Sequence, residues 1–264
     1  MRVRRLVVGV MLVGLAAIGC SSSAEAGSSH VTLTVLAASS LKNLFPKIGD
    51  QFTAAHPNVG FSFSFAGTDA LTAQIEQGAP ADVFAGASKK YGDELSSKGL
   101  IDVFSPFCTN SLVLVVPPSN PAGIQTLTDL TKPGLKLVIG SETAPVGAYT
   151  RTVLTNLNAV YGSGFSDQVL ANVVSNEDNV EGVLTKVESG EADAGFVYVT
   201  DSKAAGAAVT TIMLPSNAQA VATYPIAVVK SSAHAIDAQA FVAFVLGPTG
   251  QGLLADAGFG PPAG

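Results

Sequence analysis

The amino-acid sequence predicts an α/β protein with parallel sheets that are covered by helices on both faces. Short apolar runs alternate with segments of helical apolar spacing along most of the chain. Hydrophobic residues make up 47% of the sequence and charged residues 13%, which is typical of a compact globular protein and excludes a disordered one. The length of 264 residues is enough for one large domain or for two lobes.

The N-terminus has the features of a targeting segment. A basic start precedes an apolar run at residues 6–18, which is too short to span a membrane. The following Ala17-Ile18-Gly19-Cys20 resembles a bacterial lipobox, with alanine where leucine is preferred. We therefore expect a lipoprotein signal peptide at 1–19, lipid on Cys20 and a flexible tether at 20–30. The alternative is an ordinary secretory signal in which the cysteine is incidental.

Five elements are predicted in the part of the chain that follows the tether. Every second residue from Val59 to Phe65 is apolar, which is typical of a half-buried strand. Apolar residues recur at helical spacing from Leu41 onward, and His56-Pro57 ends this helix. In chain order the elements are a strand at 31–36, a helix over 41–55, a strand at 59–65, a short helix around Leu71 and Ile75, and a strand at 82–84.

The alternation continues to the C-terminus. Helices are predicted where apolar residues share one helical face, and strands where short apolar runs lie between polar or glycine-containing segments. The expected elements are strands at 111–116 and 136–139, helices over 146–157 and 180–187, strands at 195–199 and 226–229, and a helix over 236–244.

The charge pattern excludes a nucleic-acid-binding protein. Three of the 14 basic residues lie in the first five positions, and Arg151 is the only arginine after them. The contacts to phosphate groups on which such proteins depend are therefore missing. If Cys20 carries lipid, Cys108 has no cysteine to pair with, and we expect it to be a small buried apolar residue.

Catalytic and metal-binding signatures are also absent from the sequence. The three histidines, His30, His56 and His234, are far apart, and no GxSxG, HExxH or P-loop motif occurs. No two His or Cys residues have the spacing of metal ligands. We therefore expect no catalytic residues, no cofactor and no site for a free metal cation.

Four places in the sequence share one feature, which is that a strand ends in small or polar residues and a helix begins at once. These junctions are Ser39-Ser40, Gly67-Thr68, Pro145-Val146-Gly147 and Asn179-Val180. In open α/β sheets, ligands bind at the carboxyl ends of strands, where helix N-termini offer free backbone N–H groups and a partial positive charge. This arrangement suits an anion, to which Ser40 and Thr68 would add hydroxyl donors. The simpler alternative is that both side chains only cap their helices.

Several motifs resemble those of the molybdate-binding proteins of ABC importers. The most specific is the run at 74–84, which contains Gly78-Ala79-Pro80-Ala81-Asp82. Together the matches cover almost the whole chain after the tether. The others are Ala37-Ala38-Ser39-Ser40-Leu41, Ser64-Phe65-Ala66-Gly67-Thr68, Asn110-Ser111-Leu112-Val113, Pro145-Val146-Gly147-Ala148-Tyr149, Asn179-Val180, Gly195-Phe196-Val197-Tyr198, Tyr224-Pro225-Ile226-Ala227-Val228 and Gly258-Phe259.

The resemblance implies a two-lobed periplasmic-binding-protein fold of type II, in which helices flank a mixed, mostly parallel sheet in each lobe. Residues 31–109 and 226–264 would form lobe 1, residues 110–225 would form lobe 2, and the two crossings would act as a hinge. The oxyanion would lie between the lobes. Its donors would be hydroxyl and backbone groups of Ser40 and Thr68, backbone N–H groups of Val146 and Val180, and the phenol of Tyr198.

Two residues depart from the pattern of the family. Serine is frequent where Thr68 stands, and Asp69 places a carboxylate beside the expected dianion. We expect Asp69 to lie in the first turn of its helix, where the helix dipole favours an acid, and to face away from the ligand.

The function that the resemblance implies is capture of molybdate, with tungstate close behind, outside the cytoplasm. A lipid-anchored monomer would deliver the oxyanion to a membrane permease that is driven by a cytoplasmic ATPase, without catalysing a reaction. Two alternatives stay open. One is a binding protein of the same fold for sulfate or another small anion, and the other is a lipid-anchored enzyme or surface protein of unknown activity.

Overall fold

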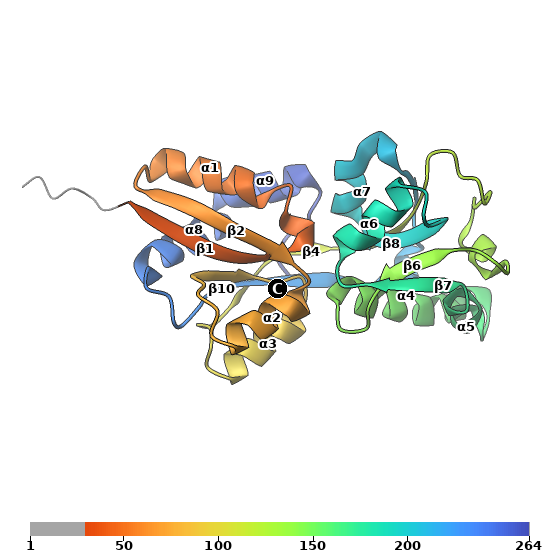
Figure 1. The fold of residues 1–264 in the computed structure, drawn as a ribbon, viewed down its shortest axis with the longest axis horizontal. Coiled ribbons are helices and arrows are strands. Elements are labelled where there is room, and N and C mark those ends of the chain that lie inside the picture. The colour runs from red at the N-terminus through yellow and green to blue at the C-terminus, as the bar shows by residue number, and fades with distance from the viewer. Residues whose placement is uncertain (1–29, 264) are drawn as a thin grey trace, which may run out of the picture.

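The structure is a computed structural model that describes residues 30–263. The predicted signal peptide, Cys20 and nearly all of the predicted tether lie outside the described residues. Two α/β units lie side by side along the long axis of the molecule (Figure 1), and each is built around one five-stranded sheet. The predicted α/β fold class is therefore confirmed.

The first unit contains a sheet of strand order β2-β1-β3-β10-β4. β1 pairs in parallel with β2 and β3, whereas β10 runs antiparallel to β3 and β4. The strands are β1 (Val31–Ala38), β2 (Val59–Ala66), β3 (Val83–Ala85), β4 (Ser105–Asn110) and β10 (Ala222–Val228). The helices are α1 (Phe45–Ala55), α2 (Thr68–Glu76), α3 (Lys89–Ser97), α8 (Ala235–Leu246) and α9 (Pro248–Ala257).

Alternating side chains on the strands build a core on each face of this sheet. On β3, Val83 and Ala85 pack into the cluster that contains residues of α1, α8 and α9, whereas Phe84 packs with residues of α2 and α3 on the other face. Period-two alternation in a strand sends neighbouring side chains to opposite faces, so a fully apolar strand is covered on both sides. In Figure 1 α1 and α9 lie above the sheet, and α2 and α3 lie below it.

The second unit contains a sheet of strand order β7-β6-β8-β5-β9. β6 pairs in parallel with β7 and β8, whereas β5 runs antiparallel to β8 and β9. The strands are β5 (Leu112–Val116), β6 (Leu137–Gly140), β7 (Val173–Glu177), β8 (Ala194–Tyr198) and β9 (Thr210–Ile212). The helices are α4 (Pro145–Tyr161), α5 (Phe165–Leu170), α6 (Val180–Glu188) and α7 (Val199–Ala205).

The chain passes between the two sheets twice. Only Ser111 separates β4 of the first sheet from β5 of the second, and the chain returns between the end of β9 and the start of β10. The first unit is therefore discontinuous in sequence, whereas the second sheet is formed by one continuous stretch. Cys108 is fully buried on β4, as predicted, and burial raises the pKa of its thiol.

Two elements begin four residues away from their predicted starts. The helix expected from Leu41 begins only at Phe45, after a 3-10 turn η1 (Ser39–Leu41), because Pro46 has no N–H to donate and fits best in the first turn of a helix. The strand expected from Ile226 begins at Ala222. It contains Pro225 at a register shift against β4, and such an irregularity accommodates the missing N–H of a proline.

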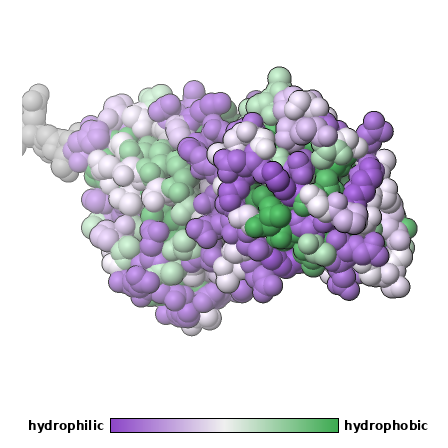
Figure 2. Space-filling view, turned by 45° about the vertical axis from the view of Figure 1, so that its right-hand side comes forward, coloured by the Kyte–Doolittle hydropathy of each residue, from purple (hydrophilic) through white to green (hydrophobic). Residues whose placement is uncertain are grey.

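One face of the molecule is mainly hydrophilic (Figure 2). Figure 2 shows polar side chains over most of one face, with smaller hydrophobic areas between them. Among residues 30–263, no single helix is long and apolar enough to cross a membrane, although α8 and α9 meet the length and composition criterion as a pair bent by 57°.

Candidate functional site

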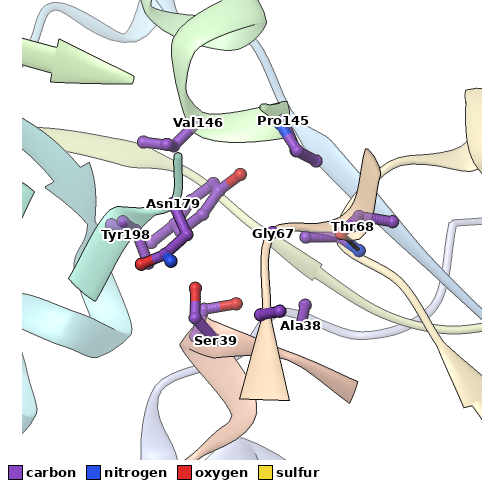
Figure 3. A pocket seen from close by; sticks show the side chains of 12 residues that line it. Ala38, Ser39, Gly67, Thr68, Pro145, Val146, Asn179 and Tyr198 are labelled. Carbon is purple, nitrogen blue, oxygen red and sulfur yellow. Dashed lines mark hydrogen bonds between the residues drawn. The ribbon is translucent and has the colours of Figure 1, made fainter. Parts of the chain in front are cut away.

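The five residues that the sequence predicted as ligand contacts line one pocket between the two units. Ser40 and Thr68 come from the first unit, and Val146, Val180 and Tyr198 come from the second. The cavity volume of the pocket is about 10 Å³, on a scale on which a single water molecule needs ~10–15 Å³, so the pocket has room only for a small ligand. Figure 3 shows the labelled residues facing one another across it. The remaining lining residues are Ala38, Ser39, Ala66, Gly67, Ala87, Pro145 and Asn179.

Free backbone N–H groups are the main chemical feature of this pocket. α2, α4, α6 and the short turn η1 all begin at its wall. No described side chain caps α2, α4 or η1, and at α6 the Asn179 side chain accepts a hydrogen bond from Gly182 only. The first N–H groups of a helix have no partner inside the helix, so uncapped starts present donors and a partial positive charge. The pocket is therefore built to receive an anion.

The two hydroxyl groups of the first unit do not cap helices. Thr68 Oγ1 accepts a hydrogen bond from the N–H of Ala87 (3.0 Å), so the Thr68 proton is left to donate elsewhere. Ser40 Oγ lies 2.9 Å from the phenol oxygen of Tyr224, which can act as donor and leave the Ser40 proton for a ligand. Both side chains are buried. The alternative that they serve only as helix caps is therefore wrong.

Tyr198 brings a phenol into the pocket at the end of β8. Its side chain is only 1% exposed, and its hydroxyl oxygen is buried without a hydrogen-bond partner among the described residues. A buried polar group without a partner costs about 1–3 kcal/mol, so this hydroxyl is ready to bond a ligand. Burial raises the pKa of Tyr198 well above its ordinary value, which keeps the phenol protonated as a donor.

Asp201 holds the backbone of Tyr198 in place. The Tyr198 N–H donates to Asp201 Oδ2 (3.1 Å), and the carboxyl group is buried in the first turn of α7. Burial raises the pKa of Asp201 to about 7, although the hydrogen bond from Tyr198 acts in the opposite direction. This contact fixes the point at which β8 turns into α7 and so orients the phenol.

The described residues that line the pocket include no Lys or Arg. Arg151 of α4 points elsewhere, because its guanidinium donates to the carbonyl oxygens of Gly140 and Gly147 and to the side chain of Asn176. It therefore braces the turn between β6 and α4. The lining of the pocket therefore offers neutral donors and helix starts.

Asp69 does not line the pocket. It lies in the first turn of α2, where it was expected, and its Oδ2 accepts a hydrogen bond from the hydroxyl of Thr143 (2.6 Å) in the facing unit. The carboxylate therefore lies at the rim of the pocket instead of against a ligand.

Two residues that contact the predicted site residues were not predicted from the sequence. Tyr224 bonds Ser40 from β10, and Ala87 donates its N–H to Thr68 from beyond β3. Neither residue lies at a helix start, so the strand-to-helix junctions that indicated the other site residues did not indicate these two. In the part of the chain that the structure describes, no group of three or more His, Cys, Asp or Glu side chains is placed to hold a metal ion.

Comparison with known proteins gives consistent results. A family model described as bacterial extracellular solute-binding protein matches residues 33–260. The molybdate-binding protein ModA of Mycobacterium tuberculosis is 37% identical over 262 residues, which covers 97% of each chain. The molybdate-binding protein ModA of Escherichia coli is 31% identical and covers 92% of this chain and 95% of its own.

One solved structure supports the same fold. The periplasmic molybdate-binding protein of Azotobacter vinelandii superposes with a TM-score of 0.76 at 24% identity, over 88% of this chain and 100% of its own. At this level of identity the likeness shows the fold alone. Both units of the present chain are therefore arranged as in a known extracytoplasmic binding protein.

Proposed function

Because this chain belongs to the family of bacterial extracellular solute-binding proteins, we propose that it captures molybdate, or tungstate, outside the cytoplasm for an ABC importer. The observation that carries the proposal is the pocket in which uncapped helix starts, two hydroxyl groups and one unpartnered phenol converge. A tetrahedral dianion has acceptors on every side and matches such a set of donors. The names of the relatives at 37% and 31% identity support the same ligand.

The proposed contacts are the donors of Ser40, Thr68, Val146, Val180 and Tyr198. They bind the oxygen atoms of the ligand, so no free metal cation and no cofactor takes part. The protein would act as a monomer, catalyse no reaction and deliver its ligand to a membrane permease with a cytoplasmic ATPase.

A calorimetric titration with molybdate, tungstate, sulfate and phosphate tests the proposal. We expect molybdate and tungstate to bind tightly and sulfate more weakly, because sulfate is a smaller tetrahedral dianion. Tight sulfate binding with weak molybdate binding would instead favour the sulfate-binding alternative.

We further expect the site to reject phosphate and to depend little on salt. Phosphate carries at least one proton at neutral pH, and a site made only of donors has no acceptor for it, so buried groups stay unpaired at about 1–3 kcal/mol each. Neutral donors inside a closed pocket are also screened less than exposed charges, whose interactions fall off over about 8 Å at physiological salt. Phosphate that binds as tightly as molybdate at about pH 7, or an affinity that falls steeply with added chloride, would contradict this prediction.

Closure of two lobes around the ligand is part of the proposed mechanism. Residues 31–109 and 226–264 would form lobe 1, and residues 110–225 would form lobe 2. The start of β10 at Ala222, in the first sheet, supports a return crossing a few residues before this boundary. The two crossings would bend as a hinge and bring the helix starts of both lobes to the oxyanion.

We expect Cys20→Ser to release the protein from membranes or to leave it unprocessed. The apolar run that ends at Gly19-Cys20 supports a lipid anchor on the mature N-terminus. One acyl chain anchors a protein only marginally, so stable attachment needs more than one. Membrane fractionation and mass spectrometry of the mature chain measure the effect. An unmodified mature chain that begins beyond Cys20 would contradict the lipid anchor and favour an ordinary secretory signal.

A further inference from the structure

Side chains at the rim of the pocket reach from one unit to the other. Asp69 of α2 accepts the hydrogen bond from the Thr143 hydroxyl, and Tyr91 of α3 donates a hydrogen bond to the carbonyl oxygen of the same residue. Asp69 and Tyr91 belong to the first unit, whereas Thr143 lies in the loop before α4 of the second. We refer to these three residues as the rim clasp.

The rim clasp joins the two helix starts that face each other across the pocket. Asp69 follows Thr68 directly, and Thr143 precedes Val146 by three residues. The loop between β6 and α4 is itself held together, since Ser141 Oγ lies 3.3 Å from both Thr143 Oγ1 and the N–H nitrogen of Ala144. Contacts that hold Thr143 in place therefore also restrain the start of α4, where the N–H of Val146 lies.

The partners of Thr143 in the first unit are a buried phenol and a carboxylate with one buried oxygen atom. Tyr91 is only 6% exposed, and burial, together with the carboxylates of Asp69 and Glu94, raises its pKa to about 12, so it remains a donor. Asp69 Oδ1 is buried without a partner among residues 30–263, so the bond from Thr143 to Oδ2 is the contact that stabilises this carboxylate. Hydrogen bonds to charged groups are stronger than those between neutral groups.

Two other contacts cross the rim and are weaker. Lys42 and Glu181 form an ion pair, but their side chains are 51% and 45% exposed, and exposed ion pairs contribute little. The Tyr149 hydroxyl lies 3.4 Å from Ser88 Oγ, which is long for a hydrogen bond. Among these links at the mouth of the pocket, the rim clasp is the one that includes a buried side chain, Tyr91.

We propose that Asp69 and Tyr91 are positioning residues that hold Thr143, and with it the start of α4, over a bound oxyanion. The rim clasp forms when the units close and sets how long the ligand stays bound. This inference rests on the proposed function, because it concerns the release of the same oxyanion. It also explains why the carboxylate of Asp69 lies next to the proposed binding site of a dianion.

The test measures association and dissociation rates of molybdate by stopped-flow fluorescence of the five tyrosines, since the chain has no Trp. Thr143→Val removes the donor, keeps the shape of the side chain and leaves Asp69 unpaired. We expect dissociation to become about tenfold faster while association changes less than about twofold. The matched control is Thr155→Val on α4, whose hydroxyl bonds the Arg151 carbonyl of its own helix. It should leave both rates unchanged.

A double-mutant cycle separates the rim clasp from a merely structural role. In an Asp69→Ala background, Thr143→Val should change dissociation less than about twofold, because the partner is already gone. Equal effects of Thr143→Val with and without Asp69 would overturn the inference, and so would an unchanged dissociation rate in Thr143→Val. Tyr91→Phe leaves Thr143 intact and must also speed dissociation, which covers the case that Thr143→Val folds poorly. A wild-type protein that does not bind molybdate would contradict the proposed function instead.

Discussion

Replacement of Tyr198 by phenylalanine is expected to weaken molybdate binding about tenfold to a hundredfold. The phenol is the one buried side-chain donor of the pocket that has no partner among the described residues. A hydrogen bond to a charged group contributes about 1.5–3 kcal/mol, and 1.4 kcal/mol corresponds to a factor of ten in affinity. Phenylalanine keeps the ring and its contact with Tyr224, whose centroid lies 6.1 Å away, so the core is preserved.

Calorimetry of the variant and its thermal unfolding without ligand measure these two effects separately. Tyr161→Phe is a matched control, because Tyr161 is 39% exposed at the end of α4, away from the pocket. It should bind molybdate as the wild type does. If Tyr198→Phe kept its affinity but unfolded at a lower temperature, Tyr198 would be a core residue and not a ligand donor.

Replacement of Gly67 by alanine is expected to lower the affinity for molybdate at least about a hundredfold. A Cβ atom at this position would lie 2.4 Å from the carbonyl oxygen of Asp178, which is backbone of the facing unit. The backbone angles of Gly67, φ −59° and ψ 140°, are ordinary for alanine. Within the first unit, the only close contact is with the Asp69 side chain, which can rotate. The substitution should therefore block closure of the two units without unfolding either of them.

The measurements are calorimetry with molybdate, thermal unfolding without ligand, and small-angle X-ray scattering with and without molybdate. We expect an unchanged unfolding temperature and no compaction on addition of ligand. Gly252→Ala on α9 is the matched control, because a Cβ atom there meets nothing within 4 Å. Affinity close to that of the wild type in Gly67→Ala would show that the closed arrangement is not required for binding.

The pattern of strand ends and helix starts made the pocket predictable. An anion site made of helix starts depends on local features of sequence, since the start of each of these helices can be recognised from the residues around it. Apolar alternation likewise identified β2, whose phenylalanines pack against the core. The fold class was therefore predictable from the sequence. It was also predictable that residues far apart in the chain line the same pocket.

The elements that were not predicted lack a periodic apolar pattern. α3 begins Lys89-Lys90 and buries only Tyr91, Gly92 and Leu95, and β9 has three residues of which two are exposed. In α9 two glycines precede the apolar pair Leu253-Leu254, and glycine lowers helix propensity. The secondary structure of these segments depends on contacts with distant parts of the chain. A local sequence pattern carries no information on such contacts.

The contacts that orient the site residues depend on the same kind of distant pairing. Ser40 and Tyr224 are 184 positions apart, and Asp69 and Thr143 are 74 apart. Side chains at such separations meet only because β10 joins the first sheet and the two units face each other. Asp69 lies in the first turn of its helix, as expected, and outside the lining of the pocket, but no local sequence pattern indicated Thr143 as its partner.

The position of β10 in the first sheet leaves that sheet incomplete until late in the synthesis of the chain. β4 is connected to β3 only through β10, which is synthesised after every strand of the second sheet. The second sheet can therefore be complete while the first still has a gap between β3 and β4, and contacts of long sequence separation form slowly. Until residues 222–228 arrive, β3 and β4 have open edges that can pair with other chains. A chain that stops before residue 222 is thus expected to aggregate or be degraded, even though its second sheet is whole.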